Sequence, residues 1–164
     1  MGTAQMQDFD DDYQRRKAFL AFYNATYRDM GGLAPDQRPM TILEQQEKEE
    51  PKRAVANSRI SVNGIVAQSF RWSTSRIARL ESELREKGII SLAELRARFQ
   101  KEYKAMIKRG ELRDLVEYYM AKELVDSDTR PATRRERDTL MDMMAAFGEA
   151  EVARFKARSP PTSS

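Results

Sequence analysis

Residues 91–108 carry the pattern that most constrains how this chain can fold. Ser91-Leu-Ala-Glu94 is a capping box, in which a serine hydroxyl and a glutamate satisfy the free amides at the start of a helix. Apolar residues then recur every three or four positions, at Leu92, Leu95, Phe99, Tyr103 and Met106. This spacing places them on one side of a helix, so the segment is predicted to be an amphipathic helix that packs against other helices.

Similar signals predict further helices on both sides of this segment. Three aspartates at 10–12 favour a helix start, and Gly31-Gly32 favours its end. Capping boxes at Thr41–Glu44 and Thr133–Glu136 begin two more helices, and Lys87-Gly88 suits a left-handed helix end. The predicted helices cover about 10–30, 41–50, 69–87, 91–109, 112–126 and 134–157.

Residues 59–68 fit two different structures. Asn63-Gly64 is a favourable two-residue turn for a β-hairpin, and a short apolar stretch lies on each side of it. The same residues can instead lead into the helix that is expected from about Ser69, because an apolar seam with helical spacing runs over 66–84. A short β-hairpin near 60–67 and a helix therefore both remain open.

These patterns predict an all-α fold, an irregular bundle of about five to six helices with a central αα-hairpin over 76–100. Seven glycines and six prolines are too few for the many tight turns of an all-β protein. The expected organisation is a flexible acidic N-terminus (1–9), an aromatic helix and a short polar helix (10–50), a basic helical core domain (51–157) and a flexible tail (158–164). The seam over 66–84 also favours a coiled-coil contact in a homo-oligomer.

The segment from Leu84 to Phe99 resembles the first two helices of winged helix-turn-helix repressors, because a four-residue turn separates two amphipathic helices. Such repressors continue with a second turn and a recognition helix. This chain instead continues from Gln100 to Lys108 in an unbroken helical pattern. The resemblance covers sixteen residues, and a plain αα-hairpin is the preferred interpretation.

The chain contains no cysteine and no histidine. Their absence excludes disulfides, zinc–thiolate sites and thiol nucleophiles, and it removes the commonest general base. No glycine-rich phosphate loop is recognisable either. We therefore expect a protein that is not an enzyme and that holds no cofactor or metal. Its polar start and its lack of any long apolar run predict no signal peptide and no membrane span, and hence a cytoplasmic protein.

Charge is distributed unevenly along the chain. The net charge is −4 over residues 1–50, +9 over 51–109 and −2 over 110–164, within a total of +3. No acidic residue occurs from Pro51 to Leu80, and Trp72 lies among the cations of this stretch. Cations with interleaved aromatic residues are typical of surfaces that bind nucleic-acid phosphates. The candidate binding residues are Lys52, Arg53, Arg59, Arg71, Trp72, Arg76, Arg79, Arg96, Arg98, Lys101, Lys104 and Lys108.

Two functional hypotheses follow from this charge distribution. In the first, a non-enzymatic helical protein contacts DNA or RNA phosphates through its basic middle, in an accessory or regulatory role, with Trp72 stacking on bases. In the second, the chain is a structural or assembly subunit of a larger complex or a homo-oligomer. The basic segment would then pair with acidic protein surfaces, as the acidic clusters of the N-terminal third allow.

Overall fold

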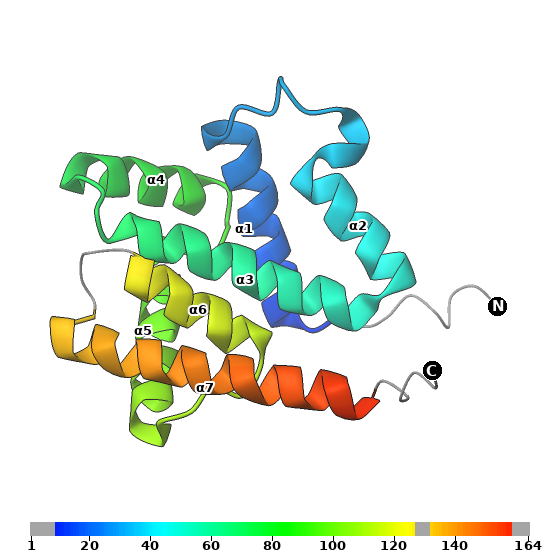
Figure 1. Cartoon of the computed structure of the whole chain (residues 1–164). Coiled ribbons are helices and arrows are strands. Elements are labelled where there is room, and N and C mark those ends of the chain that lie inside the picture. Colours follow the sequence, from blue (N-terminus) through cyan, green and yellow to red (C-terminus); the bar gives the residue numbers. More distant parts are fainter. Residues whose placement is uncertain (1–8, 127–131, 159–164) are drawn as a thin grey trace. The chain divides into compact units, whose positions relative to one another are not determined.

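A computed structural model describes residues 9–126 and 132–158 (Figure 1). Within these residues the chain forms seven α-helices and one 3-10 turn, and it has no strand, so the prediction of an all-α chain is confirmed there. The flexible ends predicted at 1–9 and 158–164 fall almost entirely outside the described residues. The elements are α1 (Asp11–Tyr27), η2 (Pro35–Gln37), α2 (Pro39–Glu49), α3 (Pro51–Ser69), α4 (Thr74–Glu86), α5 (Leu92–Arg109), α6 (Leu115–Asp126) and α7 (Arg134–Arg158).

The chain divides into two compact units, residues 1–97 and 98–164, and the boundary falls inside α5. In the first unit α1 packs against α3, and α2 and α3 form a helical hairpin. The core of this unit is mainly aromatic on the α1 side, with Tyr13, Phe19, Leu20 and Tyr23 buried. It is aliphatic on the α3 side, with Ala54, Val62, Ile65 and Val66 buried.

Helix α1 begins where the sequence predicts and ends earlier. The Asp10 side chain accepts a hydrogen bond from the Tyr13 N–H at 2.8 Å, which caps the helix start. The predicted end near Met30 is wrong, because the helix stops at Tyr27. The Gly31 N–H donates to the Asp29 carboxylate at 2.9 Å, and this local turn competes with continuation of the helix.

Helix α2 begins two residues before the predicted capping box. Pro39 occupies its first position, which suits proline because that position needs no N–H donor. Thr41 therefore lies within the first turn, and the capping box predicted at 41–44 is wrong. The helix ends at Glu49, and Pro51 begins α3 after a single intervening residue.

The hairpin considered for 60–67 is wrong, because these residues lie in the continuous helix α3. Burial of Val62, Ile65 and Val66 against α1 outweighs the turn preference of Asn63-Gly64. The long helix expected from Ser69, with its coiled-coil seam, is also wrong. The chain turns over 70–73, and the Ser73 hydroxyl caps α4 by accepting the Arg76 N–H at 3.2 Å.

The turn between α4 and α5 forms as the glycine predicts. Gly88 has a φ of +67°, and the Ile89 N–H donates back to the Leu84 carbonyl at 2.9 Å. Ser91 caps α5 by accepting the Glu94 N–H at 3.1 Å. The Glu81 carboxylate of α4 accepts the Leu92 and Ala93 N–H groups at the start of α5. Extensive side-by-side packing occurs between α2 and α3 and between α6 and α7.

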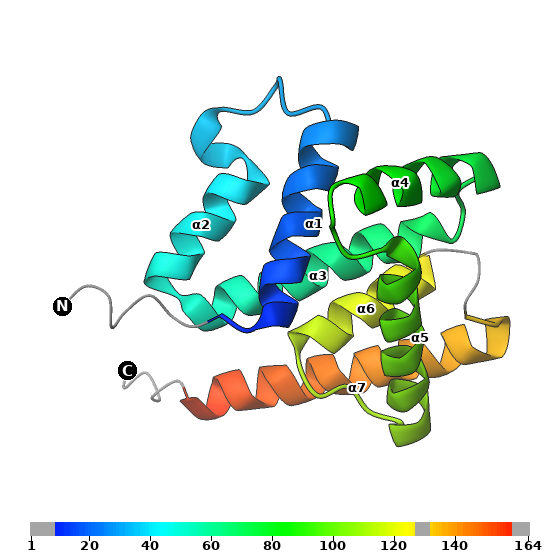
Figure 2. The ribbon, with the colours of Figure 1, turned by 180° about the vertical axis from the view of Figure 1, so that it is seen from behind.

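Helix α5 continues without a break to Arg109, so no recognition helix follows a second turn. The resemblance to winged helix-turn-helix repressors therefore stops at the helix–turn–helix outline. In the second unit, α6 and α7 lie side by side in both views (Figures 1 and 2). Their buried side chains are Val116, Met120 and Leu124 from α6 and Leu140, Met143 and Phe147 from α7.

Helix α7 begins with the capping box that the sequence predicts. The Thr133 hydroxyl accepts the Glu136 N–H, and the Glu136 carboxylate accepts the Thr133 N–H, both at 3.1 Å. Near the middle of α7, the Phe147 ring stacks on Tyr118 of α6 with 5.5 Å between ring centroids. The capping box fixes the start of α7, and the ring contact attaches its middle to α6.

Gly88→Ala is expected to lower the free energy of unfolding by about 1 kcal/mol, because the positive φ of Gly88 strains any residue that has a Cβ atom. Urea unfolding followed by circular dichroism measures this loss. Gly32→Ala is the matched control, since Gly32 has no positive φ and open space around it. An equal effect of both substitutions would contradict the assignment of strain to Gly88.

Candidate functional site

The predicted cations of the first unit differ in what they contact. Lys52 is exposed in the first turn of α3. Arg53 forms an ion pair at 3.1 Å with Glu50, the residue before α3, and Arg79 forms one with Glu83 at 3.2 Å along α4. Arg59 is half-buried on α3 and interacts with another group of the protein.

Trp72 lies in a stack of aromatic rings and cations at the end of α1. Its ring is nearly parallel to that of Tyr23, with 6.1 Å between centroids, and the Arg76 guanidinium lies 4.0 Å from the centre of the indole. Arg28 lies 5.7 Å from the Tyr23 ring. Stacking of Trp72 on a base would thus require Arg76 to leave its position. Arg71, next to Trp72 in the chain, is exposed.

Arg96 contacts the end of α3. Its Nε donates to the Ser69 hydroxyl at 3.0 Å, and its Nη2 donates to the Ser69 carbonyl at 2.7 Å. The guanidinium also lies 4.6 Å from the centre of the Phe70 ring. Burial lowers the pKa of Arg96, but arginine keeps its charge in proteins. A cation at a helix C-terminus complements the helix dipole, so Arg96 has a structural role here.

Three lysines of α5, which we call the lysine face, lie on one exposed side of the second unit: Lys101, Lys104 and Lys108. Their spacing of three and four residues places them on one line along the helix, about 10 Å long. The buried residues Tyr103 and Met106 lie on the opposite side. No lysine of this face forms an ion pair with a carboxylate in 9–126 or 132–158.

Two further residues border the lysine face. Ala105, exposed between the lysines, is too small to cover them. Arg98 is half-buried one turn earlier on α5 and is engaged in an interaction of its own. The five predicted cations that are exposed and unpaired within the described residues are therefore Lys52, Arg71, Lys101, Lys104 and Lys108.

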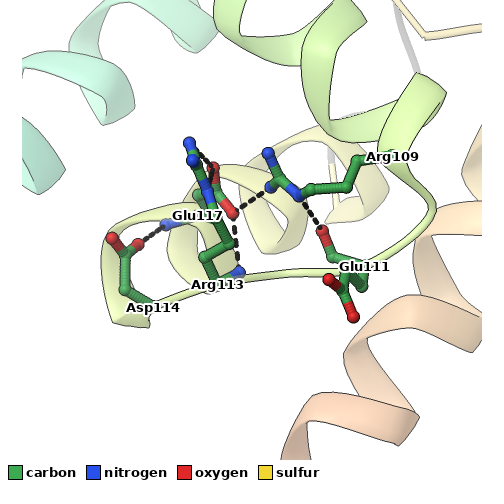
Figure 3. Close-up of polar contacts among 5 residues, drawn as sticks. All are labelled: Arg109, Glu111, Arg113, Asp114 and Glu117. Carbon is green, nitrogen blue, oxygen red and sulfur yellow. Dashed lines mark hydrogen bonds and ion pairs between the residues drawn. The ribbon is translucent and has the colours of Figure 1, made fainter.

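Sequence reasoning missed a polar cluster that joins α5 to α6 (Figure 3). Glu117 is 8% exposed and accepts from the Arg109 guanidinium, from the Arg113 N–H at 2.7 Å and from the Arg113 guanidinium at 3.2 Å. Arg109 also donates to the Glu111 carbonyl at 3.1 Å. The Asp114 carboxylate caps α6 by accepting the Glu117 N–H at 2.9 Å.

The spacing of Asp114 and Glu117 was the signal that could have revealed this cluster, since an N-cap residue followed three positions later by glutamate marks a helix start. Burial alone would raise the pKa of Glu117. The hydrogen bonds from the Arg113 N–H and from the two guanidinium groups outweigh burial and hold this pKa below its ordinary value. Glu117 is therefore a charged group that stabilises the connection between the two helices.

A hollow of about 250 Å³ lies between α1, α2 and α3. Its lining is largely apolar, and two of its polar groups pair with each other, because Asn57 donates to Gln46 at 2.8 Å. Ser58 and Ser61 also line it, but no carboxylate among the lining residues could accept a proton from either hydroxyl. The hollow therefore lacks the paired nucleophile and base that hydrolytic chemistry needs.

The described residues also contain no group of three Asp or Glu side chains that could hold a metal ion. No helix in the described part of the chain is both long and apolar enough to cross a lipid bilayer. No protein-family model, curated protein or solved structure matches this chain.

Glu117→Gln is expected to lower the free energy of unfolding at pH 7 by about 2 kcal/mol, because Arg109 would lose a charged partner in a partly buried site. Since the folded state holds the pKa of Glu117 below its unfolded value, this stabilisation is complete above about pH 4.5 and is lost as the pH falls further. Urea unfolding at pH 7 and at pH 3 measures both effects.

The free energies of unfolding of the Glu117→Gln variant and the unsubstituted protein should therefore differ less at pH 3 than at pH 7. Glu111→Gln removes a neighbouring exposed carboxylate and is the matched control, with little expected effect at either pH. Equal stability of the Glu117 variant and the unsubstituted protein at pH 7 would show that the cluster does not stabilise the fold.

Proposed function

We propose that this protein is not an enzyme and that it binds the phosphates of DNA or RNA through the lysine face of α5, in an accessory or regulatory role. The observation that carries the proposal is the alignment of three exposed lysines without carboxylate partners among the described residues. Lysines without a carboxylate partner can neutralise phosphates without first breaking an ion pair of the chain, and each such contact releases cations condensed on the nucleic acid.

The geometry of the lysine face suits a phosphate backbone. Successive lysines are about 5 Å apart along the helix axis, and their long flexible side chains can reach phosphates on either side of the helix. A lysine ammonium group acts as a compact point charge and does not recognise a particular base. We therefore expect binding that depends strongly on salt and weakly on nucleotide sequence.

The first unit contributes fewer contacts in this proposal than its charge implies. Lys52 and Arg71 are exposed and add two cations. Arg53 and Arg79 would first have to leave their glutamate partners. Trp72 supports the fold through Tyr23 and Arg76, and we assign it no stacking on bases.

Lys101→Gln, Lys104→Gln and Lys108→Gln combined are expected to weaken binding to labelled duplex DNA and single-stranded RNA in fluorescence anisotropy. Each lost phosphate contact on duplex DNA lowers the slope of log K against log salt by about 0.9, so the triple variant should lose up to about three units. The measurement compares several salt concentrations.

The matched control replaces three lysines outside this face, Lys48, Lys87 and Lys122, which changes the net charge equally. Equal binding by the two triple variants would rule out the lysine face as the contact. Absence of binding by the unsubstituted protein at low salt would reject the nucleic-acid proposal. It would direct attention to acidic protein surfaces as partners of the same lysines.

A further inference from the structure

A second hollow lies in the first unit, where the end of α1, the loop after it and the start of α2 meet (Figure 1). We call it the α1–α2 hollow. Its volume is about 500 Å³, which falls within the range of pockets that hold small molecules. Its wall is mostly apolar and includes Ala21, Ala25, Met30, Pro39 and Met40. The hollow therefore has the size and the lining of a small-molecule site.

Among the described residues that line the α1–α2 hollow, two arginines are the only charged ones. Arg28 follows the last residue of α1 and lies over the Tyr23 ring at 5.7 Å, and Arg38 precedes the first residue of α2. Both are exposed, and neither forms an ion pair with a carboxylate of residues 9–126 or 132–158. The carboxylate next to Arg28, that of Asp29, accepts the Gly31 N–H instead. Two such cations favour an anionic ligand.

The position of Arg38 is not explained by the stability of α2. The first turn of α2 borders the hollow, and a helix start carries partial positive charge from its unpaired N–H groups. A cation is unfavourable at such a place, and the Arg38 side chain does not cap the helix. An anion in the hollow would be attracted both by the arginine and by the helix start.

Asn24 gives a second, independent indication of a ligand. It lines both hollows of the first unit and is 5% exposed. Its Oδ1 atom is buried and accepts no hydrogen bond from the described residues. Buried polar atoms without a partner are rare, because leaving one unpaired costs free energy. The terminal torsion of asparagine is soft, so the amide can turn and present this oxygen to an N–H or O–H group in the hollow.

We propose that the α1–α2 hollow binds a small organic carboxylate that also has an apolar body and an N–H or O–H donor. The carboxylate pairs with Arg28 and Arg38, since a guanidinium binds a carboxylate through parallel N–H groups. The apolar body packs on the alanine and methionine side chains of the wall, and the donor reaches Asn24.

The α1–α2 hollow binds this ligand without converting it. Thr41 carries the only hydroxyl of the described lining, and no lining carboxylate could take its proton. No residue of the lysine face lines the hollow, so the proposal does not depend on nucleic-acid binding.

Dansylglycine tests the proposal, because it combines a carboxylate, a sulfonamide N–H and an apolar ring system. Dansyl emission strengthens and moves to shorter wavelength when the ring leaves water, so titration into the full-length protein gives a dissociation constant. We expect saturable binding of one probe per chain. Excitation of Trp72, the only tryptophan, should also produce dansyl emission, since Trp72 stacks on the Tyr23 ring over which Arg28 lies.

Two related probes separate the contacts. Dansylamide lacks the carboxylate and should bind about tenfold more weakly than dansylglycine, because hydrogen bonds to a charged group are lost. Dansylsarcosine has a methyl group in place of the sulfonamide hydrogen and should bind about fivefold more weakly, because Asn24 loses its donor. Equal affinities for the three probes would overturn the proposal, since they would show adsorption of the ring system alone.

Arg38→Gln should weaken dansylglycine binding about tenfold and leave dansylamide binding unchanged. Arg85→Gln is the matched control, because Arg85 is exposed on α4 and lines neither hollow. Circular dichroism verifies that both variants keep their helices. Equal weakening by both substitutions would show attraction to net charge alone and would overturn the proposal, as would the absence of saturable binding to the unsubstituted protein.

Asn24→Leu tests the donor contact, since leucine has the same number of non-hydrogen atoms and no acceptor. The substitution should reduce dansylglycine binding to the level of dansylsarcosine and leave dansylsarcosine binding unchanged. A preference for dansylglycine that persists in the variant would overturn the role of Asn24. If the variant does not fold, comparison of the two probes on the unsubstituted protein decides the same question.

Discussion

Arg96 ties the start of α5 to the end of α3, the helix against which α1 and α2 pack in the first unit. The guanidinium binds the hydroxyl and the carbonyl of Ser69, which are the last polar groups of that helix. In the opposite direction, the Glu81 carboxylate accepts the Leu92 and Ala93 N–H groups and so caps α5. A cation at a helix end and an anion at a helix start both complement the helix dipole, so the two contacts hold α3, α4 and α5 together.

This arrangement also divides the basic residues by type. The arginines Arg76, Arg96 and Arg109 lie over rings, bind carbonyl groups or pair with carboxylates inside their own units. The lysines of α5 remain in water. The planar guanidinium forms several directed contacts and loses little hydration on burial, whereas an ammonium group is strongly hydrated. The positive charge of the middle segment is therefore partly structural, and the part available to a partner is mainly lysine.

Local sequence signals predicted the elements whose ends are set locally. The turn at Gly88 and the capping box at Thr133–Glu136 form as expected, because the residues that make them are within six positions of each other. The break at 70–73 was not predictable from the apolar seam, whose helical spacing continues through it. At that break Ser73 caps the following helix, and Arg96 binds Ser69 at the end of α3 from 27 positions away.

The same distinction applies to the candidate site. Helical periodicity was sufficient to place Lys101, Lys104 and Lys108 together on α5, since their alignment depends on that helix alone. Trp72 and Arg96 contact segments that are distant in the sequence, and composition does not reveal such contacts. For this reason the sequence suggested a binding role for both residues. Glu117 was missed because its two arginine partners are recognisable only once the connection between α5 and α6 is folded.

The position of Trp72 has a practical consequence for the study of this chain. It is the only tryptophan, and its indole lies between the Tyr23 ring and the Arg76 guanidinium in the first unit. Its intrinsic emission therefore reports the local packing of α1 and the turn before α4, while the second unit contributes no tryptophan signal. Comparison of this emission with circular dichroism, which reports all helices, would reveal whether the two units melt in one step or in two.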